Sequence, residues 1–393
     1  PLGECCPAPD CPGGAELAQL QAKRRALAEA RRCLTLGQAG GGALLPSRLV
    51  LTVRRSHLLA DSLGFLASST VAELLAPRLS VCFEGELGVD VGGLSRDWFD
   101  GVARALGGPG GPLAATPDGA LAPAPAVGAG SVDAGLRAAL AAGRFLALAV
   151  LRGRPLPLLL GQVTCRHLLR LPIRAEDVGR MDPQFFRHRV EGAALCGPLT
   201  FVSAPGERPG EPEELVPGGR ELLVTEGNRE EYVCRLCKAH ACAGARPALS
   251  CFLEGFWDLL PHDLLRVQDV SPQELSALLS GSHGPDPQEW RRHSSSSAGS
   301  ELTEWFWESV GELSPSQRCL LLRFVTGSSR PPPGGFADLW PPFSLDVSSC
   351  GSAQHLPQAH TCANRIVLPR YASKAQLLEK LSIALSTEGF ALA

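Results

Sequence analysis

A single cysteine within residues 356–371, LPQAHTCANRIVLPRY, constrains this chain most. Cys362 precedes the β-branched and bulky run Ile366–Leu368, which Pro369 closes, so the run is predicted to be a buried strand with Cys362 on the loop that enters it. His360 lies two residues away, and a neighbouring imidazole lowers the pKa of a thiol and favours the nucleophilic thiolate. The spacing leaves a second interpretation open, because free cysteines are among the most buried residues and Cys362 could be an inert core residue.

Composition excludes several classes of protein. The 393 residues are 45% hydrophobic and 20% charged, which is typical of a globular protein of two or three domains. A formal net charge of −3 provides no basic field, so neither nucleic acid nor an anionic membrane surface is expected as a partner. The apolar runs at 145–151 and 156–160 are much shorter than the ~20 residues that span a bilayer, so no membrane span is expected.

The cysteines and the chain start bear on location. No secretory signal is visible, and the 14 cysteines follow no small-domain framework, which indicates reduced thiols and a cytoplasmic protein. The chain begins at Pro1 and its only methionine is Met181, which indicates a piece of a longer protein.

Five further blocks of sequence occur upstream of the cysteine motif in a fixed order. They are Phe83–Phe99 (FEGELGVDVGGLSRDWF), Val224–Tyr232 (VTEGNREEY), Trp305–Glu308 (WFWE), Leu322–Arg330 (LRFVTGSSR) and Gly334–Phe336 (GGF). Together with LPxxHTCxNxxxLPxY and a terminal GF, this order resembles the HECT family of ubiquitin ligases over roughly residues 46 to 393.

The resemblance implies an α+β fold in two lobes. The larger N-lobe is expected to be mainly helical and to include a small subdomain that binds a conjugating enzyme, and a smaller α/β C-lobe is expected to carry the catalytic cysteine. The implied divisions are a tail and amphipathic helix at 1–45, the N-lobe at 46–280 with the subdomain at about 177–250, a hinge at 281–287 and the C-lobe at 288–393.

Two stretches of biased composition are predicted to be loose. Residues 107–135 are almost only glycine, proline and alanine, which cannot bury enough apolar surface to order themselves, and they are predicted to be a flexible insertion. Ser294–Ser300 is predicted to be a surface loop.

The resemblance also implies a function. Cys362 is expected to accept ubiquitin from a ubiquitin-conjugating enzyme as a thioester and to pass it to a lysine of a protein substrate, with no cofactor. His360 is expected to orient the thiol or stabilise charge near it, and Thr361 and Asn364 to shape the loop and bond the thioester carbonyl. Phe390, in the terminal GFALA, is expected to orient the loaded lobe during transfer.

Further residues are implied to contact the partner or the other lobe. Tyr232 is expected to receive the apolar loop of the conjugating enzyme, with Phe185 as a second candidate, although either ring could instead belong to the core. Arg96 is expected to form a buried or interlobe ion pair with an acidic neighbour, and Asp97 stands where the family more often has glutamate.

A group of cysteines and a histidine could indicate a metal site. Cys234, Cys237, His240 and Cys242 supply four residue types that bind zinc within nine positions. The segment is predicted to be a helix, however, and helical spacing cannot wrap all four side chains around one ion, so no metal is expected.

Two other functions are kept as alternatives. A cysteine hydrolase of ubiquitin conjugates would need a general base, and no histidine follows Cys362 in the chain. A non-catalytic scaffold that binds ubiquitin or the conjugating enzyme would be expected to have lost the cysteine or its HTC context.

Overall fold

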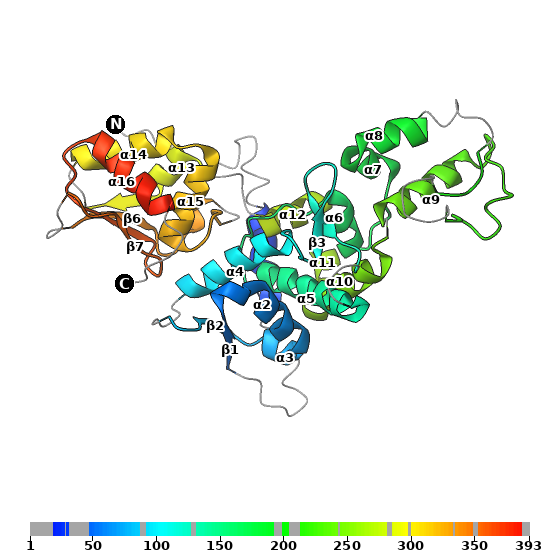
Figure 1. The fold of residues 1–393 in the computed structure, drawn as a ribbon, viewed down its shortest axis with the longest axis horizontal. Helices are drawn as coiled ribbons and strands as arrows, with labels where there is room; N and C mark the ends of the chain where they lie inside the picture. The colour runs from blue at the N-terminus through cyan, green and yellow to red at the C-terminus, as the bar shows by residue number, and fades with distance from the viewer. Residues whose placement is uncertain are drawn as a thin grey trace.

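The computed structural model describes residues 19–27, 29–30, 47–86, 92–126, 131–191, 199–203, 213–242, 244–280, 285–297, 300–332, 335–348 and 353–386. Buried apolar side chains within these residues form three separate clusters. The clusters define three bodies in a row, which we name the central lobe, the distal lobe and the C-terminal lobe (Figure 1). The mixture of helices and small sheets is α+β, as predicted.

The central lobe is mainly helical. Its strands β1 (Arg48–Val53) and β2 (Arg78–Phe83) pair in parallel, and every second residue of β1 is buried. Its helices are α2 (Leu58–Ser68), α3 (Val71–Leu74), α4 (Gly93–Leu106), α5 (Val132–Leu151), α6 (Gln162–Leu168), α10 (Arg246–Leu259), α11 (His262–Val267) and α12 (Pro272–Ser280), with a 3-10 turn η1 (Arg55–His57) after β1. Residues 49–66 therefore form a strand followed by a helix.

Helices α5 and α10 form the centre of this lobe. Gly143 on α5 lies against the Phe252 carbonyl of α10, and Gly255 lies against the Leu140 carbonyl, so that a Cβ at either glycine would overlap the facing backbone. Helix α5 is long and apolar enough to cross a membrane by length and composition, but 67% of its most apolar 18-residue window is buried inside the protein. Its apolar surface is thus used in helix packing.

The prediction of a flexible insertion at 107–135 is wrong for the described residues. Strands β3 (Leu113–Ala115) and β4 (Leu121–Pro123) form an antiparallel hairpin, and α5 begins within the predicted stretch. Leu113 is 3% exposed, and the Leu121 N–H donates to the Leu159 carbonyl. Composition misled because a few apolar residues pair with backbone that is distant in sequence, which local composition does not report.

The distal lobe contains α7 (Ala175–Met181), α8 (Pro183–Phe185), a π-helical turn η2 (Phe186–Glu191) and α9 (Arg229–Ala241). Its core is small, and it lies at the opposite end of the row from the C-terminal lobe (Figure 1). Two isolated bridges, Thr200–Leu223 and Val202–Glu214, connect its irregular segments.

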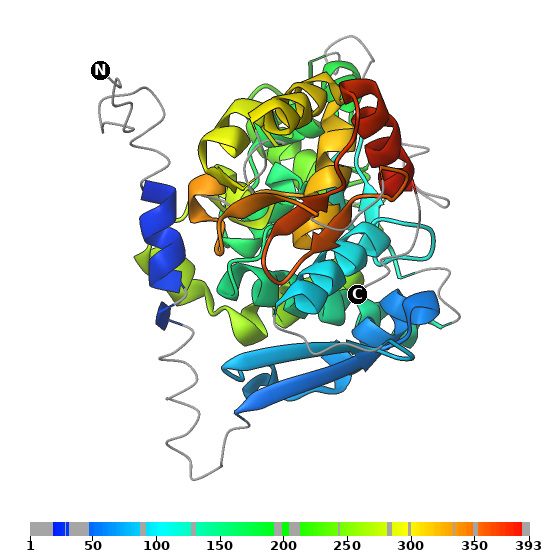
Figure 2. The same cartoon turned by 90° about the vertical axis from the view of Figure 1, so that its left-hand side faces the viewer.

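The C-terminal lobe contains a four-stranded sheet in the order β5-β6-β8-β7. Strand β6 (Phe343–Val347) pairs in parallel with β5 (Ser294–Ser296) and β8 (Arg365–Leu368), and β7 (Gln358–His360) pairs antiparallel with β8. The helices are α13 (Pro287–Arg292), α14 (Ser300–Glu312), α15 (Pro315–Thr326), the 3-10 turn η4 (Phe336–Asp338) and α16 (Lys374–Ser386), and Figure 2 shows them beside the orange and red strands.

Two predictions from the sequence concern this lobe: a surface loop at Ser294–Ser300 and a strand at 366–368. The prediction of a surface loop at Ser294–Ser300 is wrong for Ser294–Ser296, which form the edge strand β5. Helix α14 begins at Ser300. The hydroxyls of Ser295 and Ser296 donate to carbonyls of β6, which offsets the poor strand propensity of the run. The strand predicted at 366–368 is confirmed.

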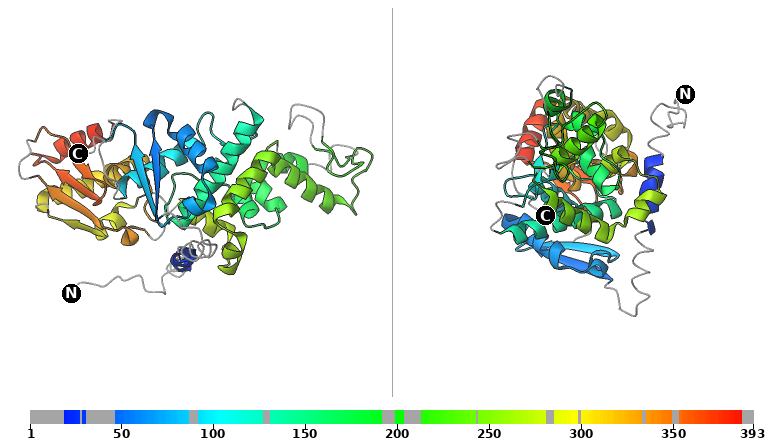
Figure 3. Two further views of the ribbon diagram at one scale, coloured as in Figure 1. Left: turned by 90° about the horizontal axis from the view of Figure 1, so that it is seen from below. Right: turned by 90° about the vertical axis from the view of Figure 1, so that its right-hand side faces the viewer.

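Residues 19–27 and 29–30 are helical and lie along the side of the molecule (Figure 3). Leu27 is buried in the central core, and Lys23 forms an ion pair of 2.8 Å with Glu274 of α12. Arg24 reaches the C-terminal lobe through an ion pair of 3.0 Å with Asp338. Lys23 and Arg24 of this helix therefore contact the protein itself. Residues 281–284 of the predicted hinge lie outside the described residues.

Candidate active site

Cys362 lies in a four-residue turn, 361–364, that joins strands β7 and β8. The Ala363 N–H donates to the His360 carbonyl at 3.0 Å and closes the turn. Asn364 has a φ of 49°, a left-handed conformation that asparagine tolerates better than most residues. The thiol of Cys362 is exposed, so Cys362 lies on an accessible loop before β8, as expected.

The side chain of Asn364 anchors this turn. It is fully buried, its Nδ2 donates to the Pro341 carbonyl at 2.6 Å, and its Oδ1 accepts from Arg96 Nη1 at 2.7 Å. Both ends of the amide are therefore engaged in holding the loop, which is the loop-shaping role expected from the sequence. The expected bond to a thioester carbonyl stays a prediction.

Arg96 of α4 holds the turn from the central lobe. Besides the bond to Asn364, its Nη2 donates to the Thr361 carbonyl at 2.6 Å and its Nε donates to the Gly92 carbonyl at 2.9 Å. Gly93 lies against Thr361 so closely that a Cβ there would overlap the threonine hydroxyl. Gly93, the first residue of α4, thus allows the helix to approach the cysteine turn, and Arg96 bonds the turn.

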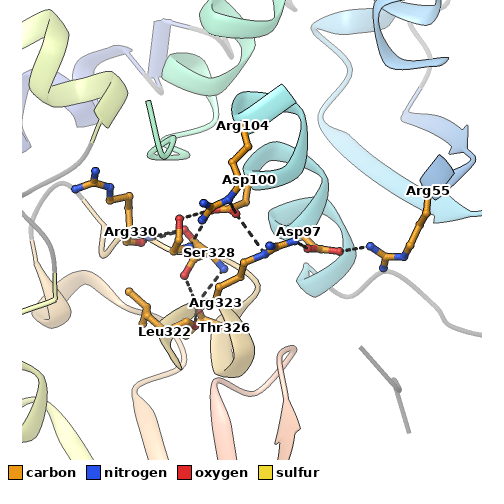
Figure 4. Close-up of polar contacts among 10 residues, drawn as sticks. Arg55, Asp97, Asp100, Arg104, Leu322, Arg323, Thr326, Ser328 and Arg330 are labelled. Atoms are coloured by element: carbon orange, nitrogen blue, oxygen red, sulfur yellow. Dashed lines mark hydrogen bonds and ion pairs between the residues drawn. The ribbon is translucent and has the colours of Figure 1, made fainter. Parts of the chain in front are cut away.

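A second contact between the lobes is ionic. Asp97 of α4 accepts from Arg323 of α15 at 3.1 Å and from Arg55 at 2.8 Å, and Asp100 accepts from the Ser329 N–H at 2.9 Å (Figure 4). An interlobe ion pair joins Asp97 and Arg323, and Arg96 bonds the neutral oxygens of Asn364 and Thr361. The expected ion pair of Arg96 with an acidic neighbour stays a prediction.

His360 does not make the contact expected of it. Within the described part of the chain, no hydrogen bond joins its ring to the thiol of Cys362 or to any other group. The residue ends β7, where it pairs with Arg365 of β8, and the turn then carries the chain away from it. Although His360 is close to Cys362 in sequence, its ring does not form a hydrogen bond with the described thiol.

Other described cysteines differ in accessibility. Burial raises the pKa of Cys165 to about 12 and, together with the charge of Cys234, raises the pKa of Cys237 to about 11. Such thiols stay protonated at neutral pH and are poor nucleophiles. Cys234 is exposed like Cys362, but it lies on the helix α9 of the distal lobe.

The four residues considered as metal ligands lie on and just after α9, and the helix predicted there is confirmed. Cys234 is exposed whereas Cys237 is buried in the distal core. The ring of His240 stacks on Phe185, with centroids 3.6 Å apart, and its Nε2 lies 3.2 Å from Asp182. No group of three or more potential ligands that could hold a metal occurs among the described residues.

The two aromatic residues expected to receive a conjugating enzyme are both in the distal core. Tyr232 is 6% exposed and packs edge-on against Phe201, and Phe185 is 8% exposed beneath His240. This corrects the expectation, because a buried ring offers no surface to a partner. Leu222 and Leu223 are the large exposed apolar residues of this lobe within the described part, with 43% and 54% exposure.

The family model for the HECT-domain (ubiquitin-transferase) matches residues 118–393, more than half of the chain. The chain belongs to the HECT family. It is 32% identical to the human E3 ubiquitin-protein ligase NEDD4 over 88% of this chain, 33% identical to UPL1 of Arabidopsis thaliana and 32% identical to pub1 of Schizosaccharomyces pombe over the same share. The chain spans 27%, 10% and 46% of those relatives' own lengths.

The predicted N-lobe, 46–280, takes in the central and distal lobes, and the predicted C-lobe, 288–393, takes in most of the C-terminal lobe. These divisions stay predictions. The motifs in the sequence do not show that Gly93 and Arg96 hold the cysteine turn, although both residues occur in the block Phe83–Phe99. The spacing of about one helical turn between the glycine pair Gly92-Gly93 and Arg96 was the feature of the sequence that could have indicated this contact. Phe390 lies outside the described residues.

Proposed function

We propose that this HECT domain accepts ubiquitin on Cys362 and transfers it to a lysine of a protein substrate. The thiolate attacks the carbonyl carbon of the thioester between ubiquitin and a conjugating enzyme, and the cysteine of that enzyme leaves as a thiolate. A lysine amine then attacks the new thioester, the bond to the Cys362 sulfur breaks, and the nitrogen loses a proton.

The observation that carries the proposal is an exposed thiol on a turn whose backbone is held rigidly from behind. Arg96 and Asn364 fix the turn through three bonds of 2.6–2.7 Å without covering the sulfur. A fixed, accessible nucleophile is what acyl transfer between two large proteins requires, because both must reach the same atom in line. Asn364 and Thr361 are proposed as loop-shaping residues, and His360 as a charge-stabilising one only when substrate is bound.

The arrangement of the lobes implies motion during the reaction. The distal lobe, where a conjugating enzyme is proposed to dock, lies at the far end of the molecule from the sheet that carries Cys362 (Figure 1). Direct transfer between two cysteines requires them to approach within bonding distance. We therefore infer that loading needs a different placement of the C-terminal lobe, with the segment around 281–287 as the expected hinge.

Partners and location are part of the same proposal. The partners are a ubiquitin-conjugating enzyme, ubiquitin and protein substrates, and the exposed pair Leu222 and Leu223 replaces Tyr232 and Phe185 as the proposed apolar contact for the conjugating enzyme. A cytoplasmic location is proposed because the eight described cysteines are free thiols, which a reducing compartment preserves.

The test is a loading assay with a panel of conjugating enzymes and labelled ubiquitin. Wild-type protein is expected to form an adduct that reductant cleaves, and Cys362→Ser at most a reductant-resistant ester. Cys234→Ser is the matched control, because it removes the other described exposed thiol and should load normally. A reductant-sensitive adduct at full level in Cys362→Ser would contradict the proposal.

A further inference from the structure

Helix α4 presents one face to the C-terminal lobe. The residues of this face have the i, i+3, i+4, i+7 spacing that places side chains on one side of a helix: Gly93, Arg96, Asp97 and Asp100. Gly93 and Arg96 contact the cysteine turn. Asp97 and Asp100 instead contact α15 and the segment that follows it. One face of α4 therefore holds the C-terminal lobe at two places.

Asp100 is the more enclosed of the two carboxylates. The residue is 1% exposed, and its carboxylate accepts from the Ser329 N–H at 2.9 Å and from the Ser329 hydroxyl. Arg323 Nε lies 3.3 Å from the same carboxylate, and Arg104 Nε, one turn further along α4, donates to it at 2.9 Å. Ser329 and Arg323 belong to the C-terminal lobe, so this carboxylate joins the two lobes (Figure 4).

A glycine allows α15 to approach α4 this closely. Gly327 caps the C-terminal end of α15 with a φ of 78°, a left-handed conformation that glycine adopts without strain. A Cβ at Gly327 would lie 2.9 Å from the Gly93 carbonyl oxygen, so any larger residue would push the two helices apart. The contact between the lobes thus depends on a close approach of backbone as well as on ion pairs.

This contact between the lobes is polar. Within the described residues, the buried apolar side chains of the central lobe and of the C-terminal lobe belong to separate clusters, so no shared core joins them. Polar interfaces between domains permit relative motion. When the lobes part, the carboxylates of Asp97 and Asp100 regain water, which offsets part of the loss of their partners. The contact is therefore suited to repeated opening and closing.

We propose that Asp100 is a positioning residue that fixes the C-terminal lobe in the placement used for transfer to lysine and releases it before Cys362 is loaded. This inference rests on the proposed function. Loading needs another placement, because the sheet that carries Cys362 lies at the opposite end of the molecule from the distal lobe (Figure 1). In the placement described, the helix face that binds Ser329 also holds the turn of Cys362, which fixes a thioester there for attack.

This role implies opposite effects on the two half-reactions. A weaker contact at Asp100 raises the fraction of molecules in which the C-terminal lobe is released, and a step that uses this minor state becomes faster as its population grows. Loading of Cys362 should therefore become faster. Transfer from loaded Cys362 should become slower, because the turn leaves its fixed position more often. A residue that only supports the fold would slow both reactions.

The test measures both half-reactions of Asp100→Asn in single turnovers, with labelled ubiquitin for loading and unlabelled ubiquitin as the lysine-bearing acceptor. At subsaturating conjugating enzyme, loading should be about threefold faster or more. Discharge of the preloaded protein should be about tenfold slower. Ser329→Ala removes one donor from the other lobe, and it should change both rates in the same directions by a smaller factor.

Arg104→Gln is the matched control. It removes an ion pair from the same carboxylate but only within α4, so both rates should remain those of wild type. The melting temperature checks the fold of each variant, and Ser329→Ala tests the contact from the other lobe if Asp100→Asn does not fold. Loading and discharge that change in the same direction, or that both stay unchanged, overturn the proposal.

Hydrogen exchange without ubiquitin separates this proposal from the proposed function. In the unloaded protein the Ser329 N–H should exchange faster in Asp100→Asn, because it loses a charged acceptor, and at the wild-type rate in Arg104→Gln. Wild-type protein that forms no thioester contradicts the proposed function and leaves this measurement intact. Exchange at Ser329 that is the same in Asp100→Asn and wild type contradicts the role of Asp100 even where loading occurs.

Discussion

The C-terminal lobe exposes its chemically distinctive side chain, Cys362, whereas the distal lobe buries several of its own. In the C-terminal lobe Cys362 is exposed, and the polar groups that fix its turn include Arg96 from another lobe. In the distal lobe Tyr232, Phe185 and Cys237 are buried in a small core to which one residue of α6, Val163, also contributes. A reactive group is accessible because its loop is supported from outside, whereas residues that resemble a site in sequence can simply complete a small core.

The largest expected effect is the difference in thiol reactivity between the two lobes. With a pKa of about 11, Cys237 has a thiolate fraction on the order of one in a thousand at pH 8. Burial raises that pKa, so the fraction increases only as the pH rises toward 11. A thiol reagent followed by peptide mass spectrometry should label Cys362 within the time in which Cys237 stays unmodified. If Cys237 is labelled as fast as Cys362 in the folded protein, the two lobes do not differ in thiol reactivity.

Truncation of a distal aromatic tests whether that lobe is an independent core. Tyr232→Ala should destabilise it by roughly 3 kcal/mol, because it removes a large buried ring and leaves a cavity. Hydrogen exchange should increase in α9 while the turn 361–364 keeps its protection. If instead the lobe keeps its stability and only the affinity for the conjugating enzyme falls, Tyr232 is a contact residue and the assignment to the core is wrong.

Removal of the arginine anchor tests whether the cysteine turn depends on the central lobe. Arg96→Gln should cost about 1–3 kcal/mol locally, because the Thr361 carbonyl and the Asn364 amide lose their partner. Hydrogen exchange in the turn should become faster, with the distal lobe unchanged, and Arg96→Lys should restore part of the protection. Arg235→Gln, on the distal lobe surface, serves as the charge control. If hydrogen exchange in the turn 361–364 is unchanged in Arg96→Gln, the C-terminal lobe holds the cysteine turn without the central lobe.

The smallest expected effect concerns the exposed surface of the distal lobe. Leu223→Ser should slow loading of Cys362 at subsaturating conjugating enzyme by about fivefold, which corresponds to ~1 kcal/mol for one apolar contact. The melting temperature should stay the same, because the side chain is 54% exposed. Leu159→Ser, at a leucine of similar exposure on the central lobe, is the control. Equal slowing in both variants would mean that Leu223 has no specific role.

The sequence by itself determined the family, the α+β fold and the position of Cys362 on a loop before a buried strand. These depend on patterns that are local in the chain: an ordered set of motifs, a β-branched run closed by proline, and helical spacing in segments such as α9 and α16.

Only the tertiary structure decided which residues act together. Arg96 and Asn364 are 268 positions apart, and the burial of Tyr232 depends on Phe201, which reaches it from another segment. The hairpin at 113–123 is held by a bond between Leu121 and Leu159, and Asp97 meets Arg55 and Arg323 from two other segments of the chain. Burial and charge convergence are properties of long-range packing, so neither residue type nor spacing along the chain specifies them.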